Sequence, residues 1–177
     1  MKKECNFTIE ELSLRSEKAK AAGIDNTPPE EVVNNLNNLI NFLLQPLRDK
    51  YGKPIVVTSG YRCRALNELV GGAKNSDHLY GFAADIYGEN IDGNLVLLML
   101  LKDMRFKQVI WERDRWIHVS WQKGHNRGET LITDDGVHYR PMDIEKFVAS
   151  RATNKRKKLH QQILDMLAEA AAEKEKK

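Results

Sequence analysis

The sequence predicts an α+β fold with a small antiparallel sheet, flanking helices and a helical extension at the C-terminus. Three observations support this: helical periodicity in residues 28–54, short segments rich in β-branched residues after residue 54, and a change to Ala, Glu, Lys and Leu after Pro141. A chain of 177 residues, 41% of them hydrophobic, can bury one core of ordinary size.

Residues 28–54 are predicted to form the longest helix. Thr27 is expected to be its N-cap, prolines and acids stand in its first turn, and Gly52 and Pro54 end it. Apolar residues recur along one face at steps of three and four: Val33, Leu36, Ile40, Leu43 and Leu47. Shorter helices are expected over 65–72 and 94–104, and the second should be buried because most of its residues are apolar.

Four segments are predicted as strands: 55–62, which runs on into a loop, 83–87, 106–112 and 116–122. The three residues between the last two segments predict a tight connection. Residues 129–133 and 137–141 are expected to add a hairpin around the turn residues 134–136. We therefore expect one domain over residues 1–140, followed by a charged helical extension over 141–177 that is either solvated or binds a partner.

Charge and hydropathy exclude several classes of protein. The formal net charge is only +3, and the basic run 154–158 has no aromatic residues beside it, so we do not expect a nucleic-acid partner. Two cysteines are too few for a disulfide framework. The most apolar run, 95–101, is too short to span a bilayer. Acidic residues interrupt the first twelve positions, so we expect no signal peptide and synthesis in the cytoplasm.

Three residues are candidate metal ligands. His78 and Asp85 stand seven positions apart, with Gly81 and two alanines between them, and Asp85 lies in a predicted strand among apolar neighbours. A buried carboxylate needs a partner, which can be a metal or a set of hydrogen-bond donors. His118 lies in the middle of another strand and shares a face with Trp116 and Ser120. Three protein ligands with one open position are typical of catalytic zinc sites.

Several motifs resemble one family. Residues 76–85, "SDHLYGFAAD", fit the pattern S-x-H-x-x-G-x-A-x-D, with "SGYRC" upstream and "QVIWE" and "WIH" downstream. In this order they resemble the zinc D-Ala-D-Ala carboxypeptidase family of peptidoglycan peptidases, and its small phage and bacterial members most of all. The resemblance runs from about residue 7 to residue 131. It implies the Hedgehog/D,D-peptidase fold for the domain over residues 1–140.

The resemblance also implies roles for individual residues. The Zn²⁺ ligands of the family fall on His78, Asp85 and His118, and its substrate-binding arginine falls on Arg62. A guanidinium can hold a carboxylate through two hydrogen bonds, which suits a peptide terminus or a D-Glu side chain. Ser76 is expected near the substrate. Trp116 is expected either to form a wall of the cleft or to pack in the core.

The general base is the point at which this sequence departs from the family. Many relatives carry an acid three residues before the last histidine, and Arg115 stands there in this chain. Glu112, at the end of a strand, is the expected base, whereas Asp114 fits a turn residue. The departure leaves open a different class of protein, a non-catalytic zinc-containing binding module with the same fold.

The expected function is hydrolysis of a peptide bond in the peptidoglycan stem peptide, with Glu112 accepting a proton from the attacking water and Arg62 binding a carboxylate of the substrate. Both D-Ala-D-Ala carboxypeptidase and L-Ala-D-Glu endopeptidase activity of the endolysin type fit the resemblance. An enzyme made in the cytoplasm would either reach the cell wall through phage or prophage lysis or act as a cytoplasmic dipeptidase. The sequence indicates neither the scissile bond nor the oligomeric state.

Overall fold

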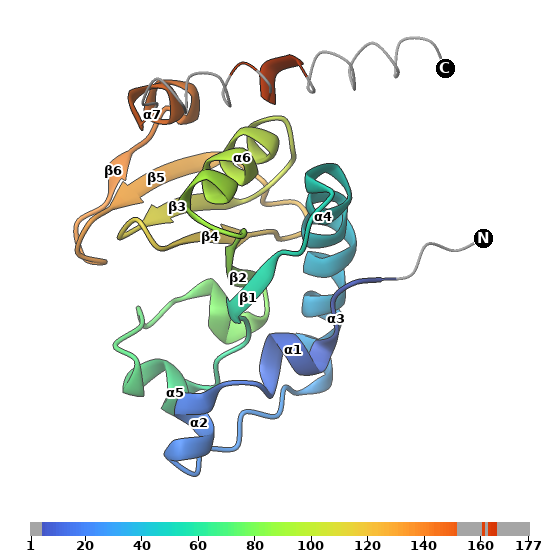
Figure 1. Ribbon diagram of the computed structural model, residues 1–177. Helices are drawn as coiled ribbons and strands as arrows, with labels where there is room; N and C mark the ends of the chain where they lie inside the picture. Colours follow the sequence, from blue (N-terminus) through green and yellow to red (C-terminus); the bar gives the residue numbers. More distant parts are fainter. Residues whose placement is uncertain (1–4, 152–160, 162, 166–177) are drawn as a thin grey trace.

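The computed structural model of the protein describes residues 5–151, 161 and 163–165. Its centre is a six-stranded sheet in the order β1-β2-β4-β3-β5-β6 (Figure 1). The strands are β1 (Val56–Ser59), β2 (Ala83–Tyr87), β3 (Gln108–Glu112), β4 (Trp116–Ser120), β5 (Glu129–Thr133) and β6 (Arg140–Pro141). Helices flank this sheet, which confirms the predicted α+β class.

The pairing of the strands differs from the expected antiparallel sheet at one place. The pairs β1–β2, β2–β4, β3–β4 and β5–β6 are antiparallel, whereas β3 and β5 are parallel. Both edges of β4 are occupied, by β2 and β3, so the returning chain pairs with the free edge of β3. A chain that reverses after β4 runs in the direction of β3, so the new pair is parallel.

The predicted helix over 28–54 is present as three consecutive pieces: α3 (Glu30–Leu39), a π-helical turn η1 (Ile40–Leu44) and α4 (Gln45–Tyr51). Pro46 accounts for the interruption, because its ring and missing N–H are incompatible with a regular hydrogen bond to the preceding turn. The N-cap is Pro29 and not Thr27 as predicted; the Thr27 N–H instead donates to Asp25. Val32 enters the core, while the expected Val33 is only partly buried.

The remaining helices are shorter, apart from α6 (Ile91–Lys102). They are α1 (Ile9–Ser13), α2 (Glu17–Ala21), α5 (Arg64–Leu69), the 3₁₀ turn η2 (Asp77–Tyr80) and α7 (Ile144–Arg151). The predicted helices 65–72 and 94–104 correspond to α5 and α6, and α6 is buried as expected. Within the described residues, no helix has both the length and the apolar composition needed to cross a membrane.

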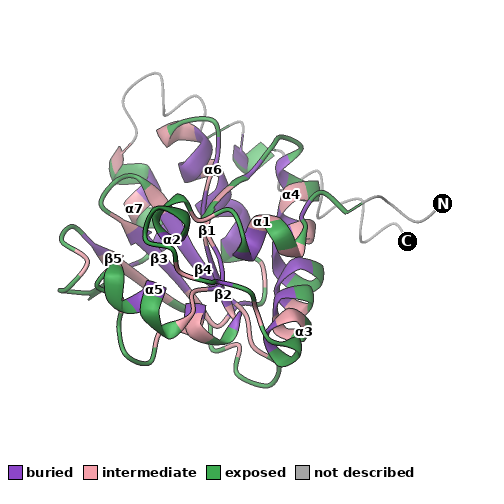
Figure 2. Cartoon of the chain, turned by 90° about the horizontal axis from the view of Figure 1, so that it is seen from below, coloured by how far each residue is buried: buried purple, intermediate pink, exposed green. Residues whose placement is uncertain are grey.

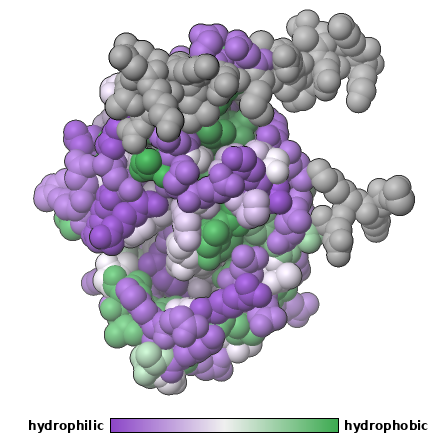
Figure 3. Space-filling model, in the orientation of Figure 1, coloured by the Kyte–Doolittle hydropathy of each residue, from purple (hydrophilic) through white to green (hydrophobic). Residues whose placement is uncertain are grey.

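The two faces of the sheet have different environments. Ala84, Val109, Trp111, Ile117 and Val119 belong to the hydrophobic core, and α6 packs against β2 and β4. Buried residues accordingly gather in the central strands β2, β3 and β4 and on the inner sides of the helices (Figure 2). On the outside, the face seen in Figure 3 is mostly hydrophilic, with small separate hydrophobic patches. Along β2, β3 and β4, the residues that alternate with these core residues face the other side of the sheet. The predicted site residues lie on that side.

Helix α7 lies beyond the predicted domain boundary at residue 140. It packs against α6, and its residues Ile144 and Val148 are part of the core. Most of the predicted extension after α7 lies outside the described residues. The division at residue 140 therefore stays a prediction, although the first helix after it shares the core of the domain.

Candidate metal centre

His78, Asp85 and His118 converge on the face of the sheet opposite the hydrophobic core. His78 Nε2 lies 3.1 Å from His118 Nδ1 and 3.1 Å from Asp85 Oδ1, and His118 Nδ1 lies 3.0 Å from the same carboxylate oxygen. Both histidines are buried, at 1% and 7% exposure. Two imidazole nitrogens and a carboxylate therefore point at one small volume, as the ligands of a metal ion do.

The fold brings the three ligands together by two local devices. In the register of the β2–β4 pair, Asp85 stands directly opposite His118, so the two side chains share a face. His78 comes from η2, which Ser76 begins by accepting a hydrogen bond from the His78 N–H at 3.4 Å. Gly81 ends this turn with a φ of 72°, a conformation that favours glycine, and the chain then enters β2.

A backbone carbonyl fixes the orientation of the His78 ring. His78 Nδ1 lies 2.6 Å from Gly60 O, so Nδ1–H donates and Nε2 is left with its lone pair toward the centre of the site. Metal-binding histidines commonly have such a partner on the other ring nitrogen. The sequence indicates the ligand but not this partner, because a backbone carbonyl carries no residue-type signal. Its only trace in the sequence is the glycine that follows β1.

The electrostatics of the site favour the protonation states that bind a metal. Burial lowers the pKa of His78, and the opposing charge of Asp85 only partly offsets this effect, so the ring is held neutral. Burial by itself would raise the pKa of Asp85. The neighbouring imidazoles of His78 and His118 outweigh that effect and lower the pKa of Asp85 instead. The site therefore offers the neutral imidazole of His78 and the carboxylate of Asp85 as metal ligands.

This donor set fits zinc. Tetrahedral zinc with nitrogen and oxygen ligands at roughly 2.0–2.2 Å keeps those ligands about 3.3–3.5 Å apart, close to the separations of 3.0–3.1 Å found here. A group of two histidines and one carboxylate also leaves a fourth position for water or substrate. The residues present thus match a catalytic zinc site in number, type and spacing.

Arg62 lies beside this group, in the segment that follows β1. Its Nη2 is 3.9 Å from Asp85 Oδ2, and its backbone N–H donates to His78 O at 3.1 Å. The side chain is only 15% exposed, yet its Nε has no hydrogen-bond partner within the described part of the chain. A buried donor without a partner is costly, so this guanidinium has capacity for an anionic ligand.

Glu112 ends β3 on the same face as the ligands. It pairs with Trp116 in the β3–β4 register, and Ile110, two residues earlier, pairs with His118. Glu112 is therefore a diagonal neighbour of His118 across the two strands. Burial raises the pKa of Glu112, and the charge of Asp85 raises it further, whereas His118 and Arg62 act in the opposite direction. The carboxyl group thus lies within the electrostatic range of the ligands and of Arg62.

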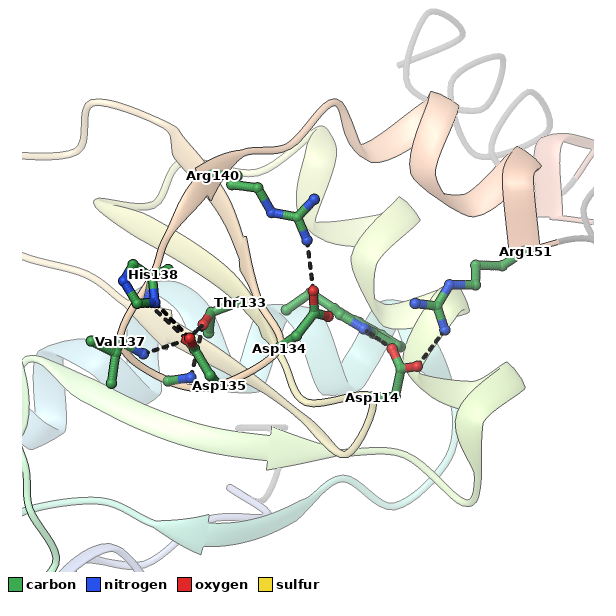
Figure 4. A network of polar contacts seen from close by, with 10 residues as sticks. Asp114, Thr133, Asp134, Asp135, Val137, His138, Arg140 and Arg151 are labelled. Atoms are coloured by element: carbon green, nitrogen blue, oxygen red, sulfur yellow. Dashed lines mark hydrogen bonds and ion pairs between the residues drawn. The ribbon is translucent and has the colours of Figure 1, made fainter.

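Asp114 faces other partners. It accepts a hydrogen bond from Trp111 Nε1 at 2.6 Å and one from Arg151 at 2.7 Å, on the side of the sheet that Trp111 shares with the core (Figure 4). Arg115, which stands where the family resemblance leads us to expect an acid, is exposed in the turn between β3 and β4. Trp116 shares the site face, and its Nε1 is buried without a partner among the described residues.

Comparison with known proteins agrees with this geometry. The chain is 40% identical over 68 residues to a zinc D-Ala-D-Ala carboxypeptidase from Streptomyces albus G. The matched segment is 38% of this chain and 26% of that relative, so the chain covers about a quarter of the relative's length. Together with the His-Asp-His group, the similarity indicates Zn²⁺ as the cofactor. A family model for peptidase M15 matches residues 5–120, well over half of the chain, and the protein therefore belongs to the peptidase M15 family.

Proposed function

We propose that the protein is a zinc-dependent peptidase that hydrolyses a peptide bond in the stem peptide of peptidoglycan. The observation that carries this proposal is the group of His78, Asp85 and His118 with the guanidinium of Arg62 beside it, whose buried Nε has no hydrogen-bond partner among the described residues. The relative from Streptomyces albus G is named for activity on D-Ala-D-Ala, the dipeptide that ends many stem peptides. Both candidate substrates, D-Ala-D-Ala and L-Ala-D-Glu, carry a carboxylate that Arg62 would bind.

His78, Asp85 and His118 would hold the ion, which when bound lowers the pKa of a coordinated water and polarises a carbonyl group. Glu112 accepts a proton from the attacking water, and the water oxygen forms the new bond to the carbonyl carbon. Glu112 then gives the proton to the leaving nitrogen as the C–N bond breaks. Arg62 donates hydrogen bonds to the substrate carboxylate and so fixes the distance between this group and the scissile bond.

The assignment of the base to Glu112 is supported by its position and surroundings. The side chain shares the face of the metal ligands, and its raised pKa brings proton uptake closer to the working pH. Asp114 is the competing carboxylate, but it accepts hydrogen bonds from Trp111 and Arg151 instead.

The test is mass spectrometry of purified muropeptides after incubation with the zinc-loaded protein. New fragments that differ by one hydrolysed peptide bond would support the proposal, and their masses would identify the bond. Asp85→Ala should abolish both zinc binding and cleavage. Glu112→Gln should retain zinc and lower kcat by about 10²–10⁴-fold. Glu129→Gln, the same change at an exposed position on β5, is the matched control and should leave kcat unchanged.

One observation favours a second candidate function, a zinc-containing binding module without turnover. Arg115 stands in the position where many relatives carry the acid, and an arginine cannot accept a proton. If this function is correct, the wild-type protein binds one zinc per chain and releases no fragment. Glu112→Gln then has no activity to remove.

A further inference from the structure

The loop 134–139, which joins β5 to β6, lies next to Glu112. Because β3 and β5 are parallel, Thr133 stands beside Glu112 in the sheet, and the chain after Thr133 leaves the sheet at the same end. The Arg113 N–H donates to Thr133 O at 2.9 Å, and its guanidinium donates to Asp135 O at 2.5 Å. The loop is thereby attached to the turn that directly follows Glu112.

Asp135 gives this loop a defined shape. Its Oδ1 accepts hydrogen bonds from the N–H groups of Val137 and His138, both at 2.8 Å, and from the Thr133 hydroxyl at 3.1 Å (Figure 4). Its Oδ2 lies 2.6 Å from His138 Nδ1. Because one carboxylate binds Thr133 at the start of the loop and both Val137 and His138 near its end, the backbone that leads to residue 139 has a defined direction.

Residue 139 is a tyrosine, in the loop that leaves the sheet at the Glu112 end of β3. Its phenol group lies within electrostatic range of Glu112, Asp85 and Arg62, three residues that come from three different strands or strand ends. The residue is 46% exposed, so its ring lies at the edge of the site rather than in the core. Its hydroxyl donates to Gly136 O at 3.0 Å, within the loop. Burial, followed by the charge of Glu112, raises the pKa of Tyr139, so the phenol stays neutral.

We propose that Tyr139 is a substrate-binding residue at the rim of the site, where its hydroxyl oxygen accepts a hydrogen bond from a backbone N–H of the peptide whose carboxylate Arg62 binds. The hydroxyl of Tyr139 donates its one hydrogen bond to Gly136 O. The lone pairs of its oxygen therefore stay available to accept a hydrogen bond. A stem peptide offers amide N–H groups next to its carboxylates. The inference rests on the proposed function, because it assumes a peptide substrate.

The position of Tyr139 in the chain indicates a role in selectivity. The family model matches residues 5–120, which contain the metal ligands, Arg62 and Glu112. Strand β5, the loop 134–139 and β6 all lie outside this segment. Tyr139 would therefore help to choose the peptide, while the matched segment carries the shared chemistry.

The experiment measures binding of the pentapeptide L-Ala-D-isoGlu-L-Lys-D-Ala-D-Ala by calorimetry, with zinc-loaded protein in the Glu112→Gln background to prevent turnover. Tyr139→Phe removes only the hydroxyl and should weaken binding about tenfold. In the background with Glu112 intact, the same change should raise KM about tenfold and leave kcat within about twofold. Val137→Ala, at a 71% exposed position of the same loop, is the matched control and should leave affinity unchanged.

The backbone amide signals of Val137 and His138 in NMR spectra report whether the loop keeps its shape, since both N–H groups bind Asp135. Weaker binding with these two signals in place supports the proposal. Equal affinity of Tyr139→Phe and its parent would overturn it, as would weaker binding accompanied by loss of the two signals. Absence of any binding by the parent would overturn it together with the stem-peptide substrate. If binding depends on Tyr139 but the wild-type protein cleaves nothing, the result would support the binding role of Tyr139 and count against the peptidase activity.

Discussion

Gly60 joins the stability of the fold to the metal centre, and Gly60→Ala tests this connection. A Cβ added at Gly60 would lie 2.2 Å from Leu12 O and within 2.9 Å of two further backbone atoms of Leu12. None of these atoms belongs to a flexible side chain. The two backbones must therefore separate by about 1.2 Å before the contact becomes an ordinary van der Waals distance.

The size of the effect follows from the hydrogen bonds on either side. Tyr61 N–H donates to the same Leu12 O at 2.7 Å, and a separation of about 1.2 Å would break this bond, at a cost of about 1 kcal/mol. Overpacking adds about 1–3 kcal/mol. For a chain of this size we expect the midpoint of thermal unfolding to fall by roughly 5–15 °C. Because Gly60 O also orients His78, zinc affinity should fall about 10–100-fold.

The assay combines thermal unfolding followed by circular dichroism with zinc affinity measured by competition against a chelator. Gly124→Ala is the control, since Gly124 has a φ of 79° and open space around its Cα. It should cost only about 1–2 kcal/mol of backbone strain and leave zinc affinity unchanged. A Gly60→Ala protein with wild-type zinc affinity would refute the assigned role of the Gly60 carbonyl.

Three further predictions concern the carboxylates and the metal. Asp114→Asn should lower the free energy of unfolding by no more than about 1 kcal/mol and leave kcat intact, because its partly exposed pair with Arg151 is structural; a large loss of kcat would reassign the base. Glu112→Gln should stabilise the metal-free protein near neutral pH, measured by urea unfolding. The pKa of Glu112 is raised on folding, so its ionisation as pH rises favours the unfolded chain, and the gain should vanish below about pH 4. Removal of zinc by a chelator should lower the unfolding midpoint by about 10 °C if free zinc was a thousand times its Kd. The Asp85→Ala protein should show no such change.

The fold class and the main elements were predictable because their signals are local. The stripe of Leu36, Leu43 and Leu47 and the apolar run of α6 are helical patterns that do not depend on the rest of the chain. The parallel β3–β5 pair was not predictable in this way, since it depends on which strand edge is free after β2 and β4 have paired. The short helices α1 and α2 were missed because each has only five residues, too few to show a period.

The candidate site shows the same difference between residues with a local sequence signal and residues placed by strand pairing. The metal ligands carry distinctive side chains in a motif, so the sequence pointed to His78, Asp85 and His118, and the structure brings them together. The roles of Arg62, Ser76, Glu112 and Trp116 stay predictions, although all four lie near the ligands or in the segment that holds them. Tyr139 belongs to no such motif, and its loop comes to the Glu112 end of β3 only through the parallel strand β5, which no local pattern encodes. The localisation also stays a prediction.

The register that sets Asp85 opposite His118 has a consequence for folding kinetics. These ligands are 33 positions apart, with α6 and β3 between them in the chain, and they meet only when β2 and β4 pair. An unfolded chain offers no such arrangement, and a transition state in which this pair is still unformed binds the ion poorly. Zinc should then slow unfolding and leave the folding rate almost unchanged, so the ion would prolong the lifetime of the native protein more than it speeds its formation.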